Sequence, residues 1–423
     1  MRYLTFVLCA FLSLTLKAQI NYNDYFTENS LRVDFVFAGN AKTEKIYLQE
    51  IKKEPFWSGV KENLLDGFNY GEYKFEIIDK KSGTLIFSRG FCTFFEEWQT
   101  IDEAKIMDRS FYQTITAPFP KDSVILNVYS RTWDGDYINE YSLEINPNDY
   151  FINPERQTYP NKKIVDNGDF DKKVDLVFLA EGYTETEMDK FERDVQKMID
   201  YLFSQEPYKN YKTRFNVWLV MSPSDESGTD IPGEHIYKRT IMNSNFYTFD
   251  SERYLTTEDV FKIRDIASVV PYDDICILVN SSKYGGGGFY NHYCLSSVDH
   301  FLSDKVFIHE FGHSFAGLGD EYFDSSTSYI DFFNLAIEPW QPNLTTLKEF
   351  DKKWKNMVNK ETPVPTPSTD QYKNTVGAYE GGGYVAKGMY RPYIDCRMKS
   401  NQAKGFCPVC QDAIVKMILF KSK

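Results

Sequence analysis

The chain has 423 residues, more than one ordinary domain of about 100–200 residues, so its length predicts at least two domains. Its formal charge of −13 disfavours contact with phosphate backbones, and we expect no nucleic-acid partner. The chain has only five histidines, all between His235 and His313, so any histidine chemistry belongs to that part of the sequence.

The N-terminus is typical of an export signal. Met1 and Arg2 supply a positive start, residues 3–16 are mostly apolar, and Ala18 is a small residue at a suitable cleavage position. We therefore predict a signal peptide over residues 1–18 and a mature protein in the periplasm, on the cell surface or outside the cell. No other apolar run reaches 18 residues, so no transmembrane span is expected in the mature chain.

The first third of the mature chain predicts an antiparallel β-sandwich over residues 19–150. Short runs that alternate apolar and polar residues are separated by Gly, Asn and Asp, as in sandwiches. These runs are residues 31–37, 73–78, 85–95, 124–130 and 141–145. This part has no histidine and one cysteine, and we find no catalytic constellation in it.

A stretch rich in turn residues, 151–165, predicts a linker, and the pattern changes after it. Residues 174–180 form an almost continuous apolar run, which is typical of a strand buried on both faces. A helix is predicted over residues 184–203 and further strands over 215–221 and 275–280. Alternating strands and helices predict an α/β domain over residues 166–423.

The sequence His309-Glu310-Phe311-Gly312-His313 is an HExxH motif on a helix predicted over residues 303–316. The i, i+4 spacing places both imidazoles on one face of the helix, where they can bind one metal ion. Glu310 projects about 100° away, where a base that activates a zinc-bound water would lie. The motif therefore predicts His309 and His313 as zinc ligands and Glu310 as the catalytic base.

A catalytic zinc needs a third protein ligand and one open position. In the metzincin pattern HExxHxxGxxH/D the third ligand is the eleventh residue, but here that residue is Gly319. Asp320 is twelfth and Glu321 is thirteenth, and the nearby glycines allow a longer turn. We favour Asp320 over Glu321, and a ligand from elsewhere in the chain remains the third alternative.

Six cysteines follow the signal peptide, an even number that permits disulfides in an exported protein. They are Cys92, Cys276, Cys294, Cys396, Cys407 and Cys410. The Cys407-Pro408-Val409-Cys410 sequence is half of a zinc-knuckle pattern, but no second CxxC accompanies it. A disulfide involving Cys396 or Cys294, or simple buried thiols, is favoured over a structural zinc site.

Several segments together resemble the IgA-peptidase family of secreted bacterial zinc metallopeptidases, including its N-terminal accessory domain. The segments that carry the resemblance are residues 309–315 followed by Asp320-Glu321-Tyr322, residues 174–184, 224–230, 390–392 and 396–398, and residues 90–100 in the first domain. The resemblance implies a metzincin-like catalytic domain with His309 and His313 on zinc, Glu310 as base and Asp320 as acidic third ligand. It also implies a methionine turn beneath the zinc, for which Met398 is the candidate.

Other side chains are weaker candidates. Tyr322, Tyr390 and Arg391 are predicted as contacts that stabilise an oxyanion or bind substrate. Residues 285–288 are four glycines, which predict either a flexible loop or a rim that pairs with an extended substrate.

Together these features predict a secreted zinc endopeptidase with a β-sandwich accessory domain and an α/β metzincin-like domain. Its partners would be proteins or peptides, with immunoglobulin and other host or mucosal proteins as candidate substrates. The alternatives are a hydrolase of non-peptide amides and a surface adhesin or glycan-binding protein with a structural zinc. An intact Glu310 favours catalysis, because a structural metal site needs no base.

Overall fold

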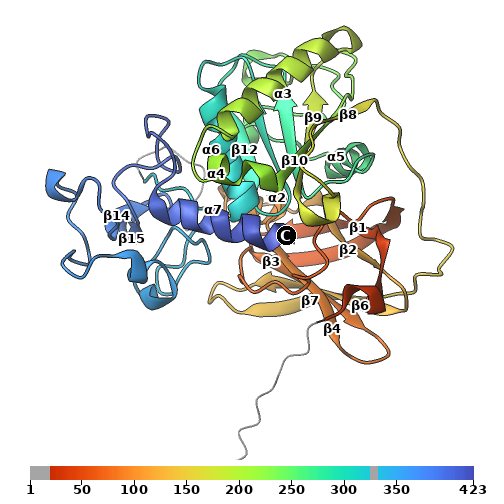
Figure 1. Cartoon of the computed structure of the whole chain (residues 1–423), viewed down its shortest axis with the longest axis horizontal. Helices are drawn as coiled ribbons and strands as arrows, with labels where there is room; N and C mark the ends of the chain where they lie inside the picture. Colours follow the sequence, from red (N-terminus) through yellow and green to blue (C-terminus); the bar gives the residue numbers. More distant parts are fainter. Residues whose placement is uncertain (1–19, 324–331) are drawn as a thin grey trace, which may run out of the picture.

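Two antiparallel sheets form the N-terminal half of the chain, as the alternating pattern predicts (Figure 1). The computed structural model describes residues 20–323 and 332–423, so the predicted signal peptide lies outside the described residues. The strand orders are β2-β1-β5 and β4-β3-β6-β7. The strands are β1 (Phe26–Asn40), β2 (Thr43–Glu54), β3 (Tyr73–Asp79), β4 (Leu85–Phe91), β5 (Arg109–Pro120), β6 (Val124–Arg131) and β7 (Tyr137–Ile145).

Aromatic side chains fill the space between these two sheets. Phe37 on β1 meets Tyr73 on β3 edge-on, with ring centroids 5.2 Å apart. Phe35 on the same strand meets Tyr141 on β7 at 5.7 Å. Rings in such tilted or edge-on pairs bury large apolar areas in a defined geometry. The high aromatic content of the sequence is therefore used to join the two sheets.

The structure differs from the prediction in two places in this half. Strands β2 and β5 were not predicted; β2 is an edge strand whose many exposed Lys and Glu residues hide the alternation. The run 85–95 was predicted as one strand, but β4 ends at Phe91 and the helix α2 (Phe94–Gln99) follows. The short helix α1 (Tyr22–Tyr25) precedes β1.

Helix α2 begins at a capping box. Thr93 Oγ1 accepts a hydrogen bond from Glu96 N at 3.0 Å, and Glu96 Oε2 accepts one from Thr93 N at 2.8 Å. These two bonds satisfy backbone donors that a helix N-terminus otherwise leaves unpaired.

The change Thr93→Ala removes one of these bonds and leaves a buried donor unsatisfied. We expect it to lower the free energy of unfolding by about 1 kcal/mol. Urea denaturation followed by circular dichroism measures this, and Thr93→Ser, which keeps the hydroxyl, is the matched control. An unchanged midpoint for Thr93→Ala would show that the cap contributes nothing to stability.

A six-stranded mixed sheet forms the centre of the C-terminal half, as the α/β pattern predicts. Its order is β12-β13-β11-β9-β10-β8. The four inner strands are parallel to their inner neighbours, whereas β12 and β8 pair antiparallel at the edges. The strands are β8 (Asn161–Val165), β9 (Val174–Glu181), β10 (Phe215–Val220), β11 (Asp274–Val279), β12 (Gly286–Phe289) and β13 (Tyr293–Ser297).

Helices pack on one face of this sheet, and the other face packs against both a helix and the sandwich. Leu176 and Phe178 on β9 belong to one core, which includes residues of α3, α6 and α7. Val177 and Leu179 on the same strand belong to a second core, which includes residues of α5 and of the N-terminal sheets. The helices are α3 (Met188–Leu202), α4 (Tyr208–Tyr211), α5 (Val260–Ala267), α6 (Ser303–Ala316) and α7 (Pro408–Lys421), and β14 (Tyr379–Gly382) pairs with β15 (Val385–Arg391).

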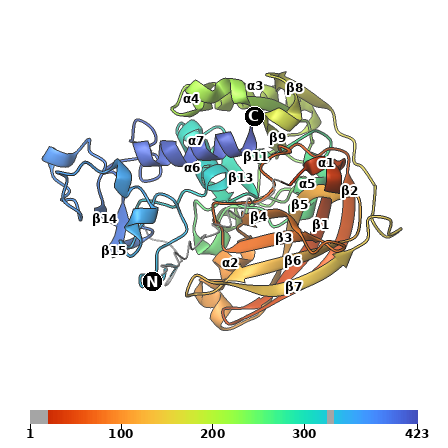
Figure 2. The same cartoon turned by 60° about the horizontal axis from the view of Figure 1, so that its bottom comes forward.

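The strands of the sandwich lie beside α5 of the α/β part (Figure 2), and one continuous apolar core joins the two parts. Tyr112 on β5 stacks on Phe261 of α5 with centroids 4.4 Å apart. Beside this pair, the buried Arg32 of β1 binds Asp265 of α5 with 2.7 Å between Nη1 and Oδ1. An interface that combines stacked rings with a buried ion pair fixes the accessory sheets against the domain that carries the HExxH helix.

The predicted linker, 151–165, is only partly a connection. Its last five residues form β8, which pairs with β10 at the edge of the C-terminal sheet. Within the part of the chain that the structure describes, no helix has both the length and the apolar character needed to cross a membrane.

Candidate metal centre and active site

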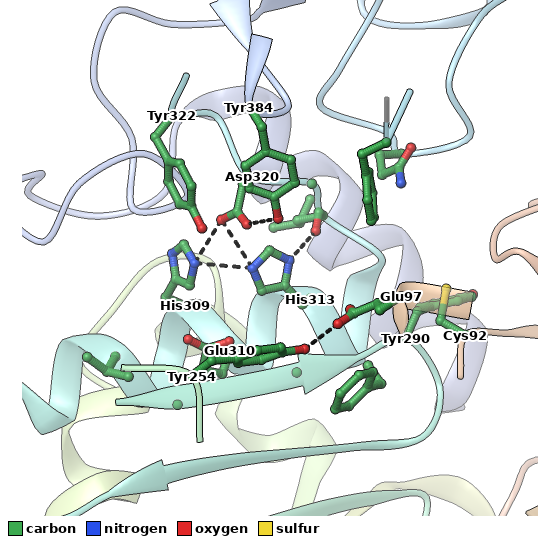
Figure 3. Close-up of a pocket in the computed structure, with 18 of the residues that line it drawn as sticks. Cys92, Glu97, Tyr254, Tyr290, His309, Glu310, His313, Asp320, Tyr322 and Tyr384 are labelled. Carbon is green, nitrogen blue, oxygen red and sulfur yellow. Dashed lines mark hydrogen bonds and ion pairs between the residues drawn. The ribbon is translucent and has the colours of Figure 1, made fainter. Parts of the chain in front are cut away.

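The HExxH motif lies on α6, which has the predicted bounds, Ser303–Ala316. The helix ends at Gly317, whose φ of +63° lies in the left-handed region that favours glycine. Gly317 N donates to His313 O at 3.0 Å and closes the last turn. His309 and His313 project from one face of the helix, and their Nε2 atoms are 3.1 Å apart (Figure 3).

Backbone carbonyls orient both imidazole rings. His309 Nδ1 donates to Arg397 O at 3.0 Å, and His313 Nδ1 donates to Leu318 O at 2.6 Å. A carbonyl oxygen only accepts, so each Nδ1 carries a proton and Nε2 is the ring nitrogen left to bind a metal. This arrangement is the usual second shell of metal-binding histidines.

The chain after the helix brings Asp320 to the same point. Its Oδ1 atom lies 3.0 Å from Nε2 of His309 and 3.3 Å from Nε2 of His313. Asn343 holds the turn, because its Oδ1 accepts from Gly319 N at 2.7 Å and its Nδ2 donates to Gly319 O at 2.8 Å. Three potential ligand atoms from two segments therefore converge.

The spacing of these three atoms fits a metal ion. Ligands about 2.0–2.1 Å from a tetrahedral zinc lie about 3.3 Å from one another, close to the three separations between His309, His313 and Asp320. Glu321, the alternative third ligand, is turned away: its Oε1 accepts from Asn343 Nδ2 at 3.0 Å and lies 3.2 Å from Cys410 Sγ. The geometry therefore favours Asp320.

Without a metal ion, the negative charge of the Asp320 carboxylate is balanced only if the site holds a proton. Burial disfavours charge on His313, but Asp320 raises the pKa of this imidazole to about 9. Burial likewise disfavours the Asp320 carboxylate, but His313 and His309 hold its pKa well below its ordinary value. Metal binding at neutral pH must therefore displace a proton from the site.

The second oxygen of Asp320 is held by a tyrosine that sequence reasoning missed. Tyr384 Oη donates to Asp320 Oδ2 at 2.6 Å, which leaves Oδ1 to face the histidines (Figure 3). Tyr384 follows the motif by more than seventy residues and lies in the turn between β14 and β15, so no local pattern indicated it.

We expect Tyr384→Phe to weaken metal binding about 10–100-fold, the usual effect of removing a hydrogen bond to a ligand. The measurement is competitive titration of the metal against a chelating indicator. Tyr379→Phe on the same hairpin is the control, because its hydroxyl donates to Tyr372 O and Thr375 O instead. Equal affinities for wild type and Tyr384→Phe would show that this hydroxyl does not position Asp320.

Glu310 lines the same cavity as the two histidines. Burial raises the pKa of its carboxyl group, and Asp320 raises it further, whereas the histidines and Arg253 oppose the shift. A carboxylate with a raised pKa is a better proton acceptor at neutral pH than an exposed one. The structure thus places a suitable base beside the candidate metal position.

The four glycines at residues 285–288 are not a flexible loop. Residues from Gly286 form the edge strand β12, which lies against α6. A Cβ at Gly288 would lie 2.3 Å from Glu310 O, and one at Gly286 would lie 2.8 Å from Glu310 Cγ. Glycine is thus required for the strand to approach the base. The outer edge of β12 is partly covered, since Leu255 N donates to Gly286 O at 3.3 Å, and pairing with substrate there stays a prediction.

A cavity of about 250 Å³ opens beside these residues, and both halves of the chain line it. The accessory half contributes Glu72, Cys92, Glu96 and Glu97. Tyr254 Oη donates to Glu97 Oε2 across the boundary (Figure 3). This contribution could not be predicted from the sequence, because these residues form no motif with the histidines.

The predicted oxyanion contacts divide into two groups. Tyr322 lines the cavity, and its ring lies nearly parallel to that of His309 with centroids 6.5 Å apart. Tyr390 and Arg391 are not among the described residues that line it; Arg391 Nη1 donates to Glu380 O at 2.8 Å and to Gly381 O at 2.6 Å. Arg253, which was not predicted, lines the cavity, with its guanidinium 5.6 Å from the ring centroid of Tyr322.

Met398 packs against the helix that carries the motif, and its assignment as a methionine turn stays a prediction. A Cβ at Gly312, between the two histidines, would lie 2.9 Å from Met398 Sδ, so this side chain packs directly on α6. Met398 O accepts from Glu321 N at 2.8 Å, and the preceding Arg397 O orients His309. The segment around Met398 thus contacts both the HExxH helix and the loop that carries Asp320.

Two protein-family models match the chain. The model described as IgA Peptidase M64 matches residues 163–374 and 368–418. The model described as Peptidase M64 N-terminus matches residues 21–142. Together they span both halves of the structure. A search of curated proteins returned no match.

Proposed function

This chain belongs to the IgA peptidase M64 family and is therefore a metallopeptidase, and from that premise we propose that it is a zinc endopeptidase whose zinc is held by His309, His313 and Asp320. One observation carries the assignment of ligands. The two Nε2 atoms and Asp320 Oδ1 lie within 3.0–3.3 Å of one another. Nitrogen and oxygen ligands at this spacing suit zinc, and three of them leave a fourth position open.

Zinc held there would supply a Lewis acid, which can polarise a scissile carbonyl and lower the pKa of an attacking water molecule. Glu310 takes the proton from this water, because it lies one residue from the first ligand and faces the cavity. The protonated Glu310 then gives the proton to the amine that leaves. Both transfers need a carboxyl group whose pKa is near the working pH, which burial of Glu310 favours.

Two side chains are placed to stabilise charge on the carbonyl oxygen. Arg253 and Tyr322 line the cavity on the side of Asp320 and contact each other through a cation–π interaction. A guanidinium or a phenol hydroxyl near the developing oxyanion lowers the barrier by electrostatic stabilisation. We assign this role to Arg253 and Tyr322 rather than to Tyr390 and Arg391, which lie outside the cavity lining.

The substrates of this site are proteins or peptides, as for any peptidase. We propose export after cleavage near Ala18, with immunoglobulin and other host or mucosal proteins as candidate substrates. No observation on the described residues favours the alternative of an adhesin with a structural zinc. A structural site has no use for the open metal position or for Glu310 beside it.

A metal-exchange assay tests the proposed function. Purified protein is stripped with a chelator, checked by elemental analysis, and incubated with casein and with immunoglobulin A before and after metal is restored. We expect cleavage to disappear on stripping and to return with zinc but not with magnesium, which prefers six oxygen ligands. Full cleavage by protein shown to be metal-free would refute the proposal.

A further inference from the structure

A second group of possible metal ligands lies behind the first. Glu321, Cys396, Cys407 and Cys410 each offer one ligand atom, and these four atoms all lie within 4.8 Å of one another. All four residues are buried, in contrast to the open cavity beside the histidines. No residue of this group lines that cavity, so the group is a separate feature of the described part of the chain.

The distances within this group suit a tetrahedral zinc site. Cys396 Sγ and Cys410 Sγ are 3.7 Å apart, and Cys410 Sγ is 3.2 Å from Glu321 Oε1. Sulfurs bound to one tetrahedral zinc at about 2.3 Å lie about 3.7–3.8 Å from each other. The CxxC spacing of Cys407 and Cys410 is also a usual spacing of zinc ligands.

Two features show that the group lacks one partner. Glu321 is fully buried, and its Oε2 atom has no hydrogen-bond partner among the described residues. A buried carboxylate oxygen that receives no hydrogen bond is costly. All six described cysteines are free thiols, so no disulfide consumes Cys396, Cys407 or Cys410. The sequence left a disulfide involving Cys396 or Cys294 and simple buried thiols as alternatives, and the described cysteines are buried thiols.

Neighbouring backbone and side-chain N–H groups donate hydrogen bonds to these candidate ligands. Cys407 N donates to Cys396 Sγ at 3.2 Å, and Asn343 Nδ2 donates to Glu321 Oε1 at 3.0 Å. Cys407 is the N-cap of the fourteen-residue helix α7, and Cys410 lies in its first turn. A helix N-terminus stabilises thiolates through its unpaired N–H groups and its dipole.

We propose that Glu321, Cys396, Cys407 and Cys410 bind a second zinc ion in a closed structural site. Three soft sulfur ligands select zinc over the hard cations magnesium and calcium. Four protein ligands complete a tetrahedral shell and leave no position for water or substrate, as in structural sites. Binding replaces the thiol protons, which are released to solvent.

This position gives the second zinc a role in shaping the first site. Glu321 directly follows Asp320, and Cys396 directly precedes Arg397, whose carbonyl orients His309. Glu321 N also donates to Met398 O at 2.8 Å. The second zinc would therefore fasten the loop that carries the third catalytic ligand to the segment beneath the HExxH helix and to α7.

Zinc counting on the full chain tests this inference separately from the proposed function. We expect about two zinc ions per wild-type chain and about one in a His309→Ala, His313→Ala double variant. Cys407→Ser should also retain about one. The matched control, Cys276→Ala, should retain two: Cys276 is likewise buried and 3.7 Å from Cys294 Sγ, but it belongs to no such group of ligands.

Two measurements on the wild type keep the test valid if a cysteine variant fails to fold. Cobalt-substituted protein should show the near-ultraviolet charge-transfer absorption of thiolate ligands, which imidazole and carboxylate ligands do not produce. In denaturant, a thiol reagent should titrate six thiols, once a chelator is added, in protein from which residues 1–18 with Cys9 have been removed. Three results would each overturn the second site. The wild type could hold a single zinc ion that the histidine double variant loses. The cobalt protein could lack thiolate absorption, or the thiol titration could find four thiols and one disulfide.

Discussion

Glu310→Gln is expected to lower kcat/KM about 10²–10⁴-fold, the contribution typical of a positioned general base. Glutamine has nearly the same shape but cannot accept the proton from the attacking water. The metal ligands are untouched, so the variant should hold as much zinc as the wild type. Steady-state cleavage of a fluorogenic peptide and elemental analysis of the same sample measure the two quantities.

Glu97→Gln is the matched control for this prediction. Glu97 lines the same cavity, but it comes from the accessory half and accepts a hydrogen bond from Tyr254. We expect it to alter KM more than kcat, because it lies away from the three ligand atoms. A Glu310→Gln protein with wild-type kcat and normal zinc content would remove Glu310 from the mechanism.

The second large effect is expected for Asp320→Asn. This change removes the negative charge of the third ligand, whose Oδ1 lies 3.0 Å from His309 Nε2. Zinc affinity at this site should fall by more than the 10–100-fold typical of outer-shell changes. Activity at low zinc should fall in parallel and recover as zinc is raised. The zinc concentration that gives half-maximal activity is the measurement.

The variant Glu321→Gln distinguishes between Asp320 and Glu321, which the sequence left as alternatives for the third metal ligand. Its carboxylate faces Cys410 and Asn343 rather than the histidines. The zinc concentration for half-maximal activity should therefore rise much less for Glu321→Gln than for Asp320→Asn. The reverse order would contradict the assignment of Asp320 as the third ligand.

Local patterns in the sequence were sufficient to predict α6, which carries the HExxH motif, and α3. The bounds of α6 follow from a helical apolar face and from Gly317, which ends the helix in a left-handed conformation. The helix predicted over residues 184–203 corresponds to α3, preceded by a capping box between Thr184 and Glu187. Each of these signals lies within one or two turns of the residues that it determines.

Contacts between distant segments could not be read in the same way. The choice between Asp320 and Glu321 depends on Asn343, which clamps Gly319 from more than twenty residues away. Tyr384 and Arg253 reach the site from opposite directions in the sequence, and neither belongs to a motif. Their positions depend on how loops pack, which periodicity and turn residues do not specify.

The packing of the accessory half against the C-terminal part could not be predicted from local patterns either. Alternating apolar residues predicted five of its seven described strands and missed β2 and β5. The face of each strand that meets the C-terminal sheet depends on tertiary packing. Val177 and Leu179 of β9 share a core with the N-terminal sheets, and Glu97 reaches the cavity. The half without visible chemistry in its sequence is thus part of the wall of the candidate active site.

Anomalous diffraction recorded on both sides of the zinc absorption edge tests the central claim most directly. Crystals of active protein should show a peak about 2.0–2.2 Å from His309 Nε2, His313 Nε2 and Asp320 Oδ1, the bond lengths of zinc to nitrogen and oxygen. Active protein with no zinc peak among these three atoms would contradict the account.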